Sequence, residues 1–472
     1  MPGNRLAVNI LSLTTAQVIV KLINVAVSIA VVRYLGTDEL GRYAYVLAFA
    51  FPFGALADFG LGTFAIREMS RTPARESELF CTLQRALAGL AGLGWVALMG
   101  AGAVLHYGDS VLLVSLALAG AANVLSAVTT PLLAVLTSRE DLHRVAVYQV
   151  LASLLGSIAI VAALAVGGAT VALLFAATIA NLCMWAVAYA LVRRLPERAP
   201  IPAGPVIRMI REAAPFGLLL VVFALYYRID TVILQWLRDP REVGLYAAAY
   251  KFLDAIVVLA GALGATFYPR FSRLAFDNQP DIRIILESMS RIILVAGVPI
   301  VLATLVTADS LVLALFGPEY GESGLILRIL ILGALPLFLV FIHNFALQSA
   351  NRVWPLVRVY GVGCMLNVIA NVALVPAWGA RGAAVAASAC EWLTLGLVLL
   401  LSGQTFGMSW SWAGTWRYAL AAGGMAIVLG AIHAHGVWAA AAAGLAVYAG
   451  SLWVAGFLHT TEVVAFRRLF SL

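Results

Sequence analysis

Eight ionisable side chains lie inside long apolar stretches of this sequence, where a charge is costly unless it faces protein or water. They are four cations and four carboxylic acids: Lys21, Arg228, Lys251, Arg358, Asp58, Asp230, Asp254 and Glu391. Arginine binds phosphate through two parallel N–H bonds, and lysine binds it as a point charge. The cations are therefore candidates for binding an anionic ligand, and the acids for ion or proton coupling or internal pairing. The alternative is that all eight only pair with one another or extend to the membrane surface.

The spacing of polar residues places several candidates on defined helix faces. One face carries four of them at i, i+4, i+7 and i+11, namely Gln17, Lys21, Asn24 and Ser28. Such a stripe faces a cavity or a partner helix, not lipid. Lys251 and Asp254 are three residues apart and can form an internal pair. Beside Arg228, Tyr227 is a further candidate for the cavity, since an aromatic hydroxyl suits the hydroxyl groups of sugars.

Local alternatives compete at three of the charged positions. A shorter stripe is formed by Ser388, Glu391 and Thr394. Arg358 lies near the end of its apolar run, so extension to the membrane surface competes with a place in the cavity. Asp58 precedes a glycine pair, where a kink or a capping contact competes with ion coupling.

The composition is that of a polytopic, all-α membrane protein. Of 472 residues 63% are hydrophobic and 11% are charged, and the mean hydropathy is +0.98. A soluble domain is nearer half apolar and a quarter charged. The long continuous runs indicate helices, because barrel strands alternate over about ten residues. The net charge of +7 comes from arginines between the apolar runs, which indicates membrane topology and not a nucleic-acid surface.

Motifs of soluble enzymes and of metal sites are absent. The four cysteines are scattered, and neither a P-loop nor GxSxG nor HExxH occurs. We therefore expect a protein that is not an enzyme and that needs no cofactor or metal.

Fourteen apolar segments of about 20 residues predict fourteen transmembrane helices. They fall at 8–32, 41–65, 84–106, 110–136, 145–166, 169–192, 212–235, 243–268, 284–307, 324–349, 353–376, 380–402, 413–433 and 437–459. With this assignment 20 arginines of the connections fall on one side and six on the other. The positive-inside rule then places both termini in the cytoplasm.

A proline- and arginine-rich stretch divides the chain after the sixth helix. It reads "RRLPERAPIPAGPVIRMIRE" at 193–212, and its prolines resist helix formation. We therefore predict an N-terminal lobe of helices 1–6 (1–195), a cytoplasmic linker (196–211), a C-terminal lobe of helices 7–12 (212–404), and helices 13–14 with a cytoplasmic tail (405–472).

An internal repeat supports this division. Residues 39–67 align without gaps on residues 242–270, an offset of 203, with Glu39 on Glu242 and Gly41 on Gly244. Six helices separate the copies, so the halves have the same orientation and enclose a central cavity, as in transporters. The charges within the apolar runs do not recur in both halves. At the same offset Arg228 faces Val25, and Lys251 faces Ala48. Shared residues therefore indicate structure, and the unshared charges indicate a ligand.

Two motifs resemble a known family. "RIDTVILQWLRDPREVGLYAAAYKFLDA" (228–255) resembles the helix 7–8 signature of bacterial polysaccharide (Wzx-type) flippases, and "YLGTDELGRYAYVLAF" (34–49) resembles the helix 1–2 region of the same family. "ADFGLGTFAIRE" (57–68) is similar to the end of helix 2. These flippases belong to the multidrug/oligosaccharidyl-lipid/polysaccharide exporter superfamily. The resemblance implies two parallel-repeat six-helix lobes around a cavity, plus two extra C-terminal helices.

The resemblance also implies an activity. Such a flippase moves undecaprenyl-diphosphate-linked oligosaccharide across the bacterial inner membrane for surface polysaccharide biosynthesis. Alternating access with a cationic cavity would carry the anionic headgroup. We expect a monomer, with a polysaccharide polymerase and glycosyltransferases as candidate partners. Two alternatives stay open: a cation-coupled multidrug exporter of the same superfamily, and a membrane glycosyltransferase or polymerase.

Overall fold

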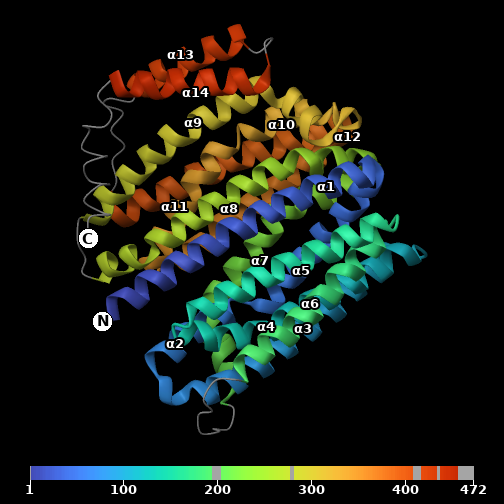
Figure 1. The fold of residues 1–472 in the computed structure, drawn as a ribbon, viewed down its shortest axis with the longest axis vertical. Helices are drawn as coiled ribbons and strands as arrows, with labels where there is room; N and C mark the ends of the chain where they lie inside the picture. The colour runs from blue at the N-terminus through green and yellow to red at the C-terminus, as the bar shows by residue number, and fades with distance from the viewer. Residues whose placement is uncertain (1, 194–203, 277–280, 408–415, 433–435, 455–472) are drawn as a thin grey trace. The chain divides into compact units, whose positions relative to one another are not determined.

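The computed structural model describes residues 2–193, 204–276, 281–407, 416–432 and 436–454. Side chains are described for residues 19–193, 204–257, 271, 282–407, 420–432, 436 and 439–454. Every regular element in these ranges is a helix (Figure 1). A helix satisfies its own backbone hydrogen bonds, which is what a chain this apolar needs in lipid. The all-α membrane fold predicted from composition is therefore confirmed.

Contacts divide the chain into two compact units, Met1–Val232 and Ile233–Leu472. The elements of the first unit, together with α7, which continues into the second, are α1 (Pro2–Asp58), α2 (Leu61–Arg71), the short 3-10 helix η1 (Pro73–Arg75), α3 (Glu76–Leu105), α4 (Ser110–Ser138), α5 (Leu142–Ala165), α6 (Thr170–Val192) and α7 (Val206–Leu237). The predicted lobe boundaries at 195/196 and 404/405 stay predictions, and residues 196–203 of the linker lie outside the described residues.

The second unit holds the remaining helices. They are α8 (Pro240–Phe276), α9 (Asp281–Phe316), the 3-10 helix η2 (Pro318–Tyr320), α10 (Ser323–Ile331), α11 (Ala334–Ser349), α12 (Val353–Phe406), α13 (Trp416–Ile432) and α14 (Val437–Val454).

Each of the fourteen predicted segments has a helical counterpart in the described residues. Two long elements each combine two helices across a kink, α1 at Gly36 and α12 at Gly379. The predicted segment 324–349 is the α10–α11 pair, which is bent by 44°. Among the described residues eight helices are long and apolar enough to cross a membrane, or up to nine with the bent pair counted as one span.

Short polar turns begin several helices. Asp109 accepts a hydrogen bond from the backbone N–H of Leu112 at 3.0 Å, and Asp141 accepts one from that of Arg144 at 3.4 Å. Each carboxylate satisfies an N–H that the first turn leaves without a partner. These caps fix where α4 and α5 start.

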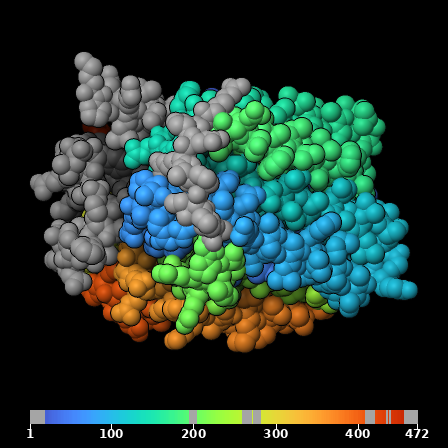
Figure 2. All heavy atoms as spheres, turned by 90° about the horizontal axis from the view of Figure 1, so that it is seen from below, coloured from blue at the N-terminus to red at the C-terminus, as the bar shows by residue number. Residues whose placement is uncertain are grey.

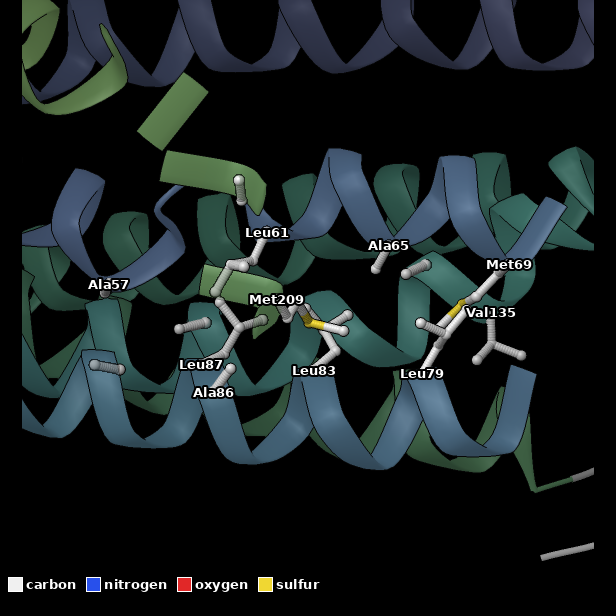
Figure 3. Packing of buried hydrophobic residues seen from close by; sticks show 14 residues of the cluster. Ala57, Leu61, Ala65, Met69, Leu79, Leu83, Ala86, Leu87, Val135 and Met209 are labelled. Atoms are coloured by element: carbon white, nitrogen blue, oxygen red, sulfur yellow. The ribbon is translucent and has the colours of Figure 1, made fainter. Parts of the chain in front are cut away.

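A buried apolar cluster joins α2, α3, α4 and the start of α7 at one end of the first unit. In Figure 3 the side chains of Leu61, Leu83, Leu87 and Met209 point toward one another, and none is more than 5% exposed. On the face drawn in Figure 2, α2 and the start of α3 (blue) lie against the start of α7 (green). The first half of α7 is therefore part of the first unit's core.

Helix α1 ends in a tight break that packs on α7. Phe59 has φ 45° and Gly60 has φ 67°, both left-handed. A left-handed phenylalanine is uncommon and persists only where its surroundings hold it. Here a Cβ added to Gly217 of α7 would lie 2.5 Å from the Phe59 ring, so only a glycine leaves room for it.

In the second unit α13 and α14 pack on α9. Met425 and Leu429 of α13 and Ala440 of α14 are fully buried in this contact. The hydroxyl of Tyr448 donates to the carbonyl of Val295 at 2.8 Å. The last two helices are thus attached to the unit through α9.

We predict that Gly217→Ala destabilises the protein, because the new methyl group overlaps the Phe59 ring. Overpacking of this kind costs about 1–3 kcal/mol. The measurement is the apparent melting temperature of the purified protein in detergent. Gly89→Ala in α3 is the matched control, since nothing lies within 4 Å of its new Cβ. Equal melting temperatures for the two variants would contradict the packing described.

Candidate functional site

Arg228 lies in α7 against two aromatic rings. Its guanidinium carbon is 4.8 Å from the centroid of the Tyr227 ring and 5.8 Å from that of Phe51 in α1. A cation over an aromatic face at this distance is attracted by the ring. The side chain is half-buried, so these contacts stabilise a guanidinium within an apolar span.

The two rings differ in their surroundings. Tyr227 is 7% exposed and stacks on Phe223 of the same helix, with centroids 5.6 Å apart and an angle of 14° between the rings. Phe51 is 42% exposed. Sequence reasoning missed Phe51, because a phenylalanine in an apolar helix carries no signal of a contact with a residue so far along the chain.

Asp230 lies two residues after Arg228 but in a different environment. It is 2% exposed, and its Oδ1 accepts hydrogen bonds from the N–H of Thr231 at 2.6 Å and from the Thr231 hydroxyl at 3.3 Å. Residues two apart on a helix point about 200° apart. The two charges of this span therefore face different neighbours.

The polar stripe of α1 reaches α5. Asn24 is exposed, and its Oδ1 accepts a hydrogen bond from the hydroxyl of Ser153 at 3.1 Å. Lys21 is half-buried one turn earlier. The side chain of Gln17, the next member of the stripe, lies outside the described residues.

Asp58 makes a local capping contact at the break between α1 and α2. Its Oδ2 accepts from the backbone N–H of Gly60 at 3.2 Å, and its side chain is half-buried. The capping role considered from the sequence therefore has a structural counterpart, and ion coupling by Asp58 stays a prediction.

The remaining candidates lie in the second unit. Lys251 and Asp254 are half-buried on α8, and Arg358 is exposed near the start of α12. Lys251 and Asp254 both lie in the continuous helix α8, where residues three apart are on the same face. A cavity position for these residues stays a prediction.

The stripe that contains Glu391 packs on the α10–α11 break. Ser388, Glu391 and Thr394 are 7%, 9% and 0% exposed. The Ser388 hydroxyl donates to the carbonyl of Ile329 at 2.7 Å, and a Cβ on Gly333 would lie 3.5 Å from the Glu391 side chain. This face therefore meets a partner helix, one of the two surroundings that a polar stripe predicts.

A buried histidine lies deeper in the same unit. His343 of α11 is fully buried, with Nε2 3.2 Å from the Ser290 hydroxyl of α9 and Nδ1 2.9 Å from the Ser402 hydroxyl of α12. A neutral imidazole supplies one donor and one acceptor, which matches two hydroxyl partners. This contact joins three helices and needs no catalytic role.

No group of three or more His, Cys, Asp or Glu side chains that could hold a metal ion occurs among the described residues. The chemistry that the candidates offer is binding, through cationic, aromatic and amide groups within apolar helices.

Comparison with known proteins gives the family. The family model described as "Polysaccharide biosynthesis protein" matches residues 6–275, more than half of the chain. The chain belongs to the polysaccharide biosynthesis protein family. The matched range includes the motifs on which the resemblance to polysaccharide flippases was based, and that resemblance is confirmed.

A named relative matches over a shorter range. The "Probable flippase AglR" of Haloferax volcanii is 28% identical over 179 residues, which is 37% of each chain. The match thus spans little more than a third of that relative.

Solved structures give the fold. The lipid II flippase MurJ in an inward closed conformation superposes with a TM-score of 0.74 and 10% identity, covering 94% of this chain and 98% of that chain. An inward-facing MATE family transporter of the MOP superfamily superposes with a TM-score of 0.67 and 15% identity, covering 84% of this chain and 98% of that chain. At this identity the likeness establishes that the fold is shared with flippases and multidrug transporters.

We predict different accessibility for the two charged positions of α7. In a background without the native cysteines, Arg228→Cys reacts with a charged, water-soluble thiol reagent, because the half-buried Arg228 is expected to face a water-filled cleft. Asp230→Cys is the matched control, and it stays protected because Asp230 is 2% exposed. Labelling yield by mass spectrometry measures the difference. Equal or reversed yields would exclude the assignment of Arg228 to the cleft.

Proposed function

We propose that this protein is a flippase that moves undecaprenyl-diphosphate-linked oligosaccharide from the inner to the outer leaflet of the bacterial inner membrane. It would act by alternating access, with a cationic cavity. The family match supports a place in polysaccharide biosynthesis. The relative from Haloferax volcanii and a solved structure with the same fold are both named as flippases, which supports the movement of a lipid-linked glycan.

The observation that carries the substrate chemistry is Arg228, a half-buried guanidinium within an apolar span. A diphosphate headgroup is anionic and cannot cross hydrocarbon unaided. A guanidinium can bind it through two charge-assisted hydrogen bonds, and the faces of neighbouring aromatic rings attract the cation. The polyprenyl tail can stay in lipid while the headgroup passes.

The other cations and polar groups extend this chemistry. Lys21 and Lys251 would add point charges for the diphosphate, and Arg358, at the exposed start of α12, would meet the headgroup near the membrane surface. Gln17, Asn24 and Tyr227 would contact the hydroxyl groups of the sugars. Phe51, the more exposed of the two rings beside Arg228, would lie next to the bound headgroup.

The carboxylic acids are proposed for ion or proton coupling or for internal pairing. For Asp230 we favour bracing, because it is almost fully buried and accepts two hydrogen bonds from Thr231. Asp254 and Glu391 are the alternatives for coupling. Asp58 accepts a hydrogen bond from the N–H of Gly60, a contact that it can make without facing a cavity.

The proposal also includes an oligomeric state, an orientation in the membrane and partner enzymes. It would act as a monomer with both termini in the cytoplasm, and would receive its substrate from glycosyltransferases and pass it to a polysaccharide polymerase.

We predict that Arg228→Ala lowers flipping of a diphosphate-linked oligosaccharide in reconstituted vesicles by at least about tenfold. A hydrogen bond to a charged group contributes about 1.5–3 kcal/mol, and 1.4 kcal/mol is a factor of ten. Arg228→Lys keeps the charge but loses the bidentate geometry, so we expect an intermediate rate. Arg241→Ala is the control, because the Arg241 side chain is 57% exposed and pairs with Glu322. Normal flipping by Arg228→Ala would refute the role of this residue.

The same vesicles separate the proposed substrate from its alternatives. A monophosphate-linked oligosaccharide should be flipped more slowly than the diphosphate form if the cations bind the diphosphate. A cationic dye should not be moved. Transport of the dye with no flipping of either lipid would make the protein a multidrug exporter, the function compatible with its likeness in fold to a MATE transporter.

A further inference from the structure

Glu39 ties the corner between the two halves of α1 to the start of α6. It follows the kink at Gly36 by three residues, and its Oε2 accepts hydrogen bonds from the N–H of Thr170 at 3.3 Å and from the Thr170 hydroxyl at 2.9 Å. The same hydroxyl lies 3.2 Å from the backbone carbonyl oxygen of Glu39. Thr170 is the first residue of α6 and is 4% exposed.

Glu242 makes the corresponding contact in the second unit. It lies in the first turn of α8, and its Oε2 accepts a hydrogen bond from the N–H of Ala380 at 2.6 Å. Ala380 follows Gly379, the kink of α12, where the last helix of the second repeat begins. A Cβ on Gly379 would overlap the Glu242 carboxylate, so the close approach requires a glycine.

An arginine completes the second contact. Arg238 donates to the carbonyls of Val375 at 3.2 Å and of Pro376 at 2.6 Å, and lies 3.8 Å from Glu242. These carbonyls end the first half of α12, so the cation satisfies acceptors on one side of the kink while the carboxylate satisfies a donor on the other. A helix C-terminus favours a cation and a helix N-terminus favours an anion, so Arg238 and Glu242 each lie at the end that suits their charge.

The two contacts are related by the internal repeat. Glu39 and Glu242 are aligned identities at the offset of 203. Their partners, Thr170 and Ala380, lie outside the aligned segments, and each starts the sixth helix of its half. The two contacts were therefore not used to find the alignment. They show that the equivalence of the halves includes the sixth helix as well as the first helix pair.

We propose that Glu39 and Glu242 are equivalent latches, each of which holds the first helix pair of its half onto the sixth helix throughout the working cycle. The pair and the sixth helix then move as one body, and alternating access arises elsewhere than at these corners. This inference rests on the proposed function for its transport readout, but the contact itself can be measured without substrate.

A different role for the two carboxylates leads to the opposite expectation. If either glutamate bound a coupling ion or the headgroup in turn, its contact with the sixth helix would break in every cycle. A covalent bond in place of the contact distinguishes the two roles, because a latch tolerates it and a moving contact does not.

The test replaces each contact by a reducible cross-link in a background without the native cysteines, with the pairs Glu39→Cys/Thr170→Cys and Glu242→Cys/Ala380→Cys. We expect each pair to cross-link on oxidation with a short bifunctional thiol reagent, which supplies the length by which cysteine is shorter than glutamate, and flipping to return to within about twofold of the background protein. In the reduced state we expect flipping to fall severalfold. The single variants Thr170→Cys and Ala380→Cys are controls for the substitutions.

Two outcomes would overturn the proposal. The first is flipping in the reduced state with arrest on oxidation, because the contact would then have to open. The second is failure of both pairs to cross-link, because the contacts would then be absent from the folded protein.

A melting curve in detergent tests the latch without a transport assay. We expect the oxidised pair to melt higher than its reduced form, and Glu39→Gln, which keeps an acceptor oxygen, to melt closer to the background protein than Glu39→Ala does. No difference among these proteins would overturn the latch. If the background protein flips nothing while these differences appear, the proposed function fails and the latch stands.

Discussion

The constraint on which the whole structure depends is that backbone polar groups in lipid need partners within the protein. A continuous helix meets it without help, and most of this chain consists of such helices. Each break frees carbonyls and N–H groups that only side chains can then satisfy. At the α10–α11 break the Ser388 hydroxyl and the indole N–H of Trp392 donate to the carbonyls of Ile329 and Leu332. The polar residues of the membrane helices are therefore partly explained by the breaks that they stabilise.

The polar residues that stabilise helix breaks can be set apart from those that are candidates for binding a ligand. Asp58, Glu242 and Ser388 each bond a backbone group at a break, so their presence in apolar helices follows from the fold. Arg228 differs, because no break lies beside it in α7, and its guanidinium lies against the faces of Tyr227 and Phe51. A ring face attracts a cation, so these contacts favour a charged side chain at this position of an apolar helix.

Much of the fold could be predicted from the sequence, because hydropathy and length are local properties. The fourteen segments, the family and the repeated first helix pair were all accessible in this way. The bend within 324–349 was not, since an apolar run carries no sign of where its hydrogen bonds are interrupted. Phe51 beside Arg228 was missed for the same reason, as was the fact that the first half of α7 packs with α2 and α3. These contacts depend on packing between distant segments, and periodicity records only which face of a helix is polar.

In the internal repeat, residues that are identical in the two halves have a different role from residues that differ. Where the halves agree, as at Glu39 and Glu242, the residue bonds a backbone N–H at the start of the sixth helix. Where they differ, the geometry differs as well. The break at Phe59 and Gly60 aligns with Ala262 and Leu263, which lie within the continuous helix α8. Fold symmetry therefore does not require that break, its packing on Gly217 of α7, or the charge of Arg228. Within the first unit, these differences lie on α7 and on the end of α1 that packs against it.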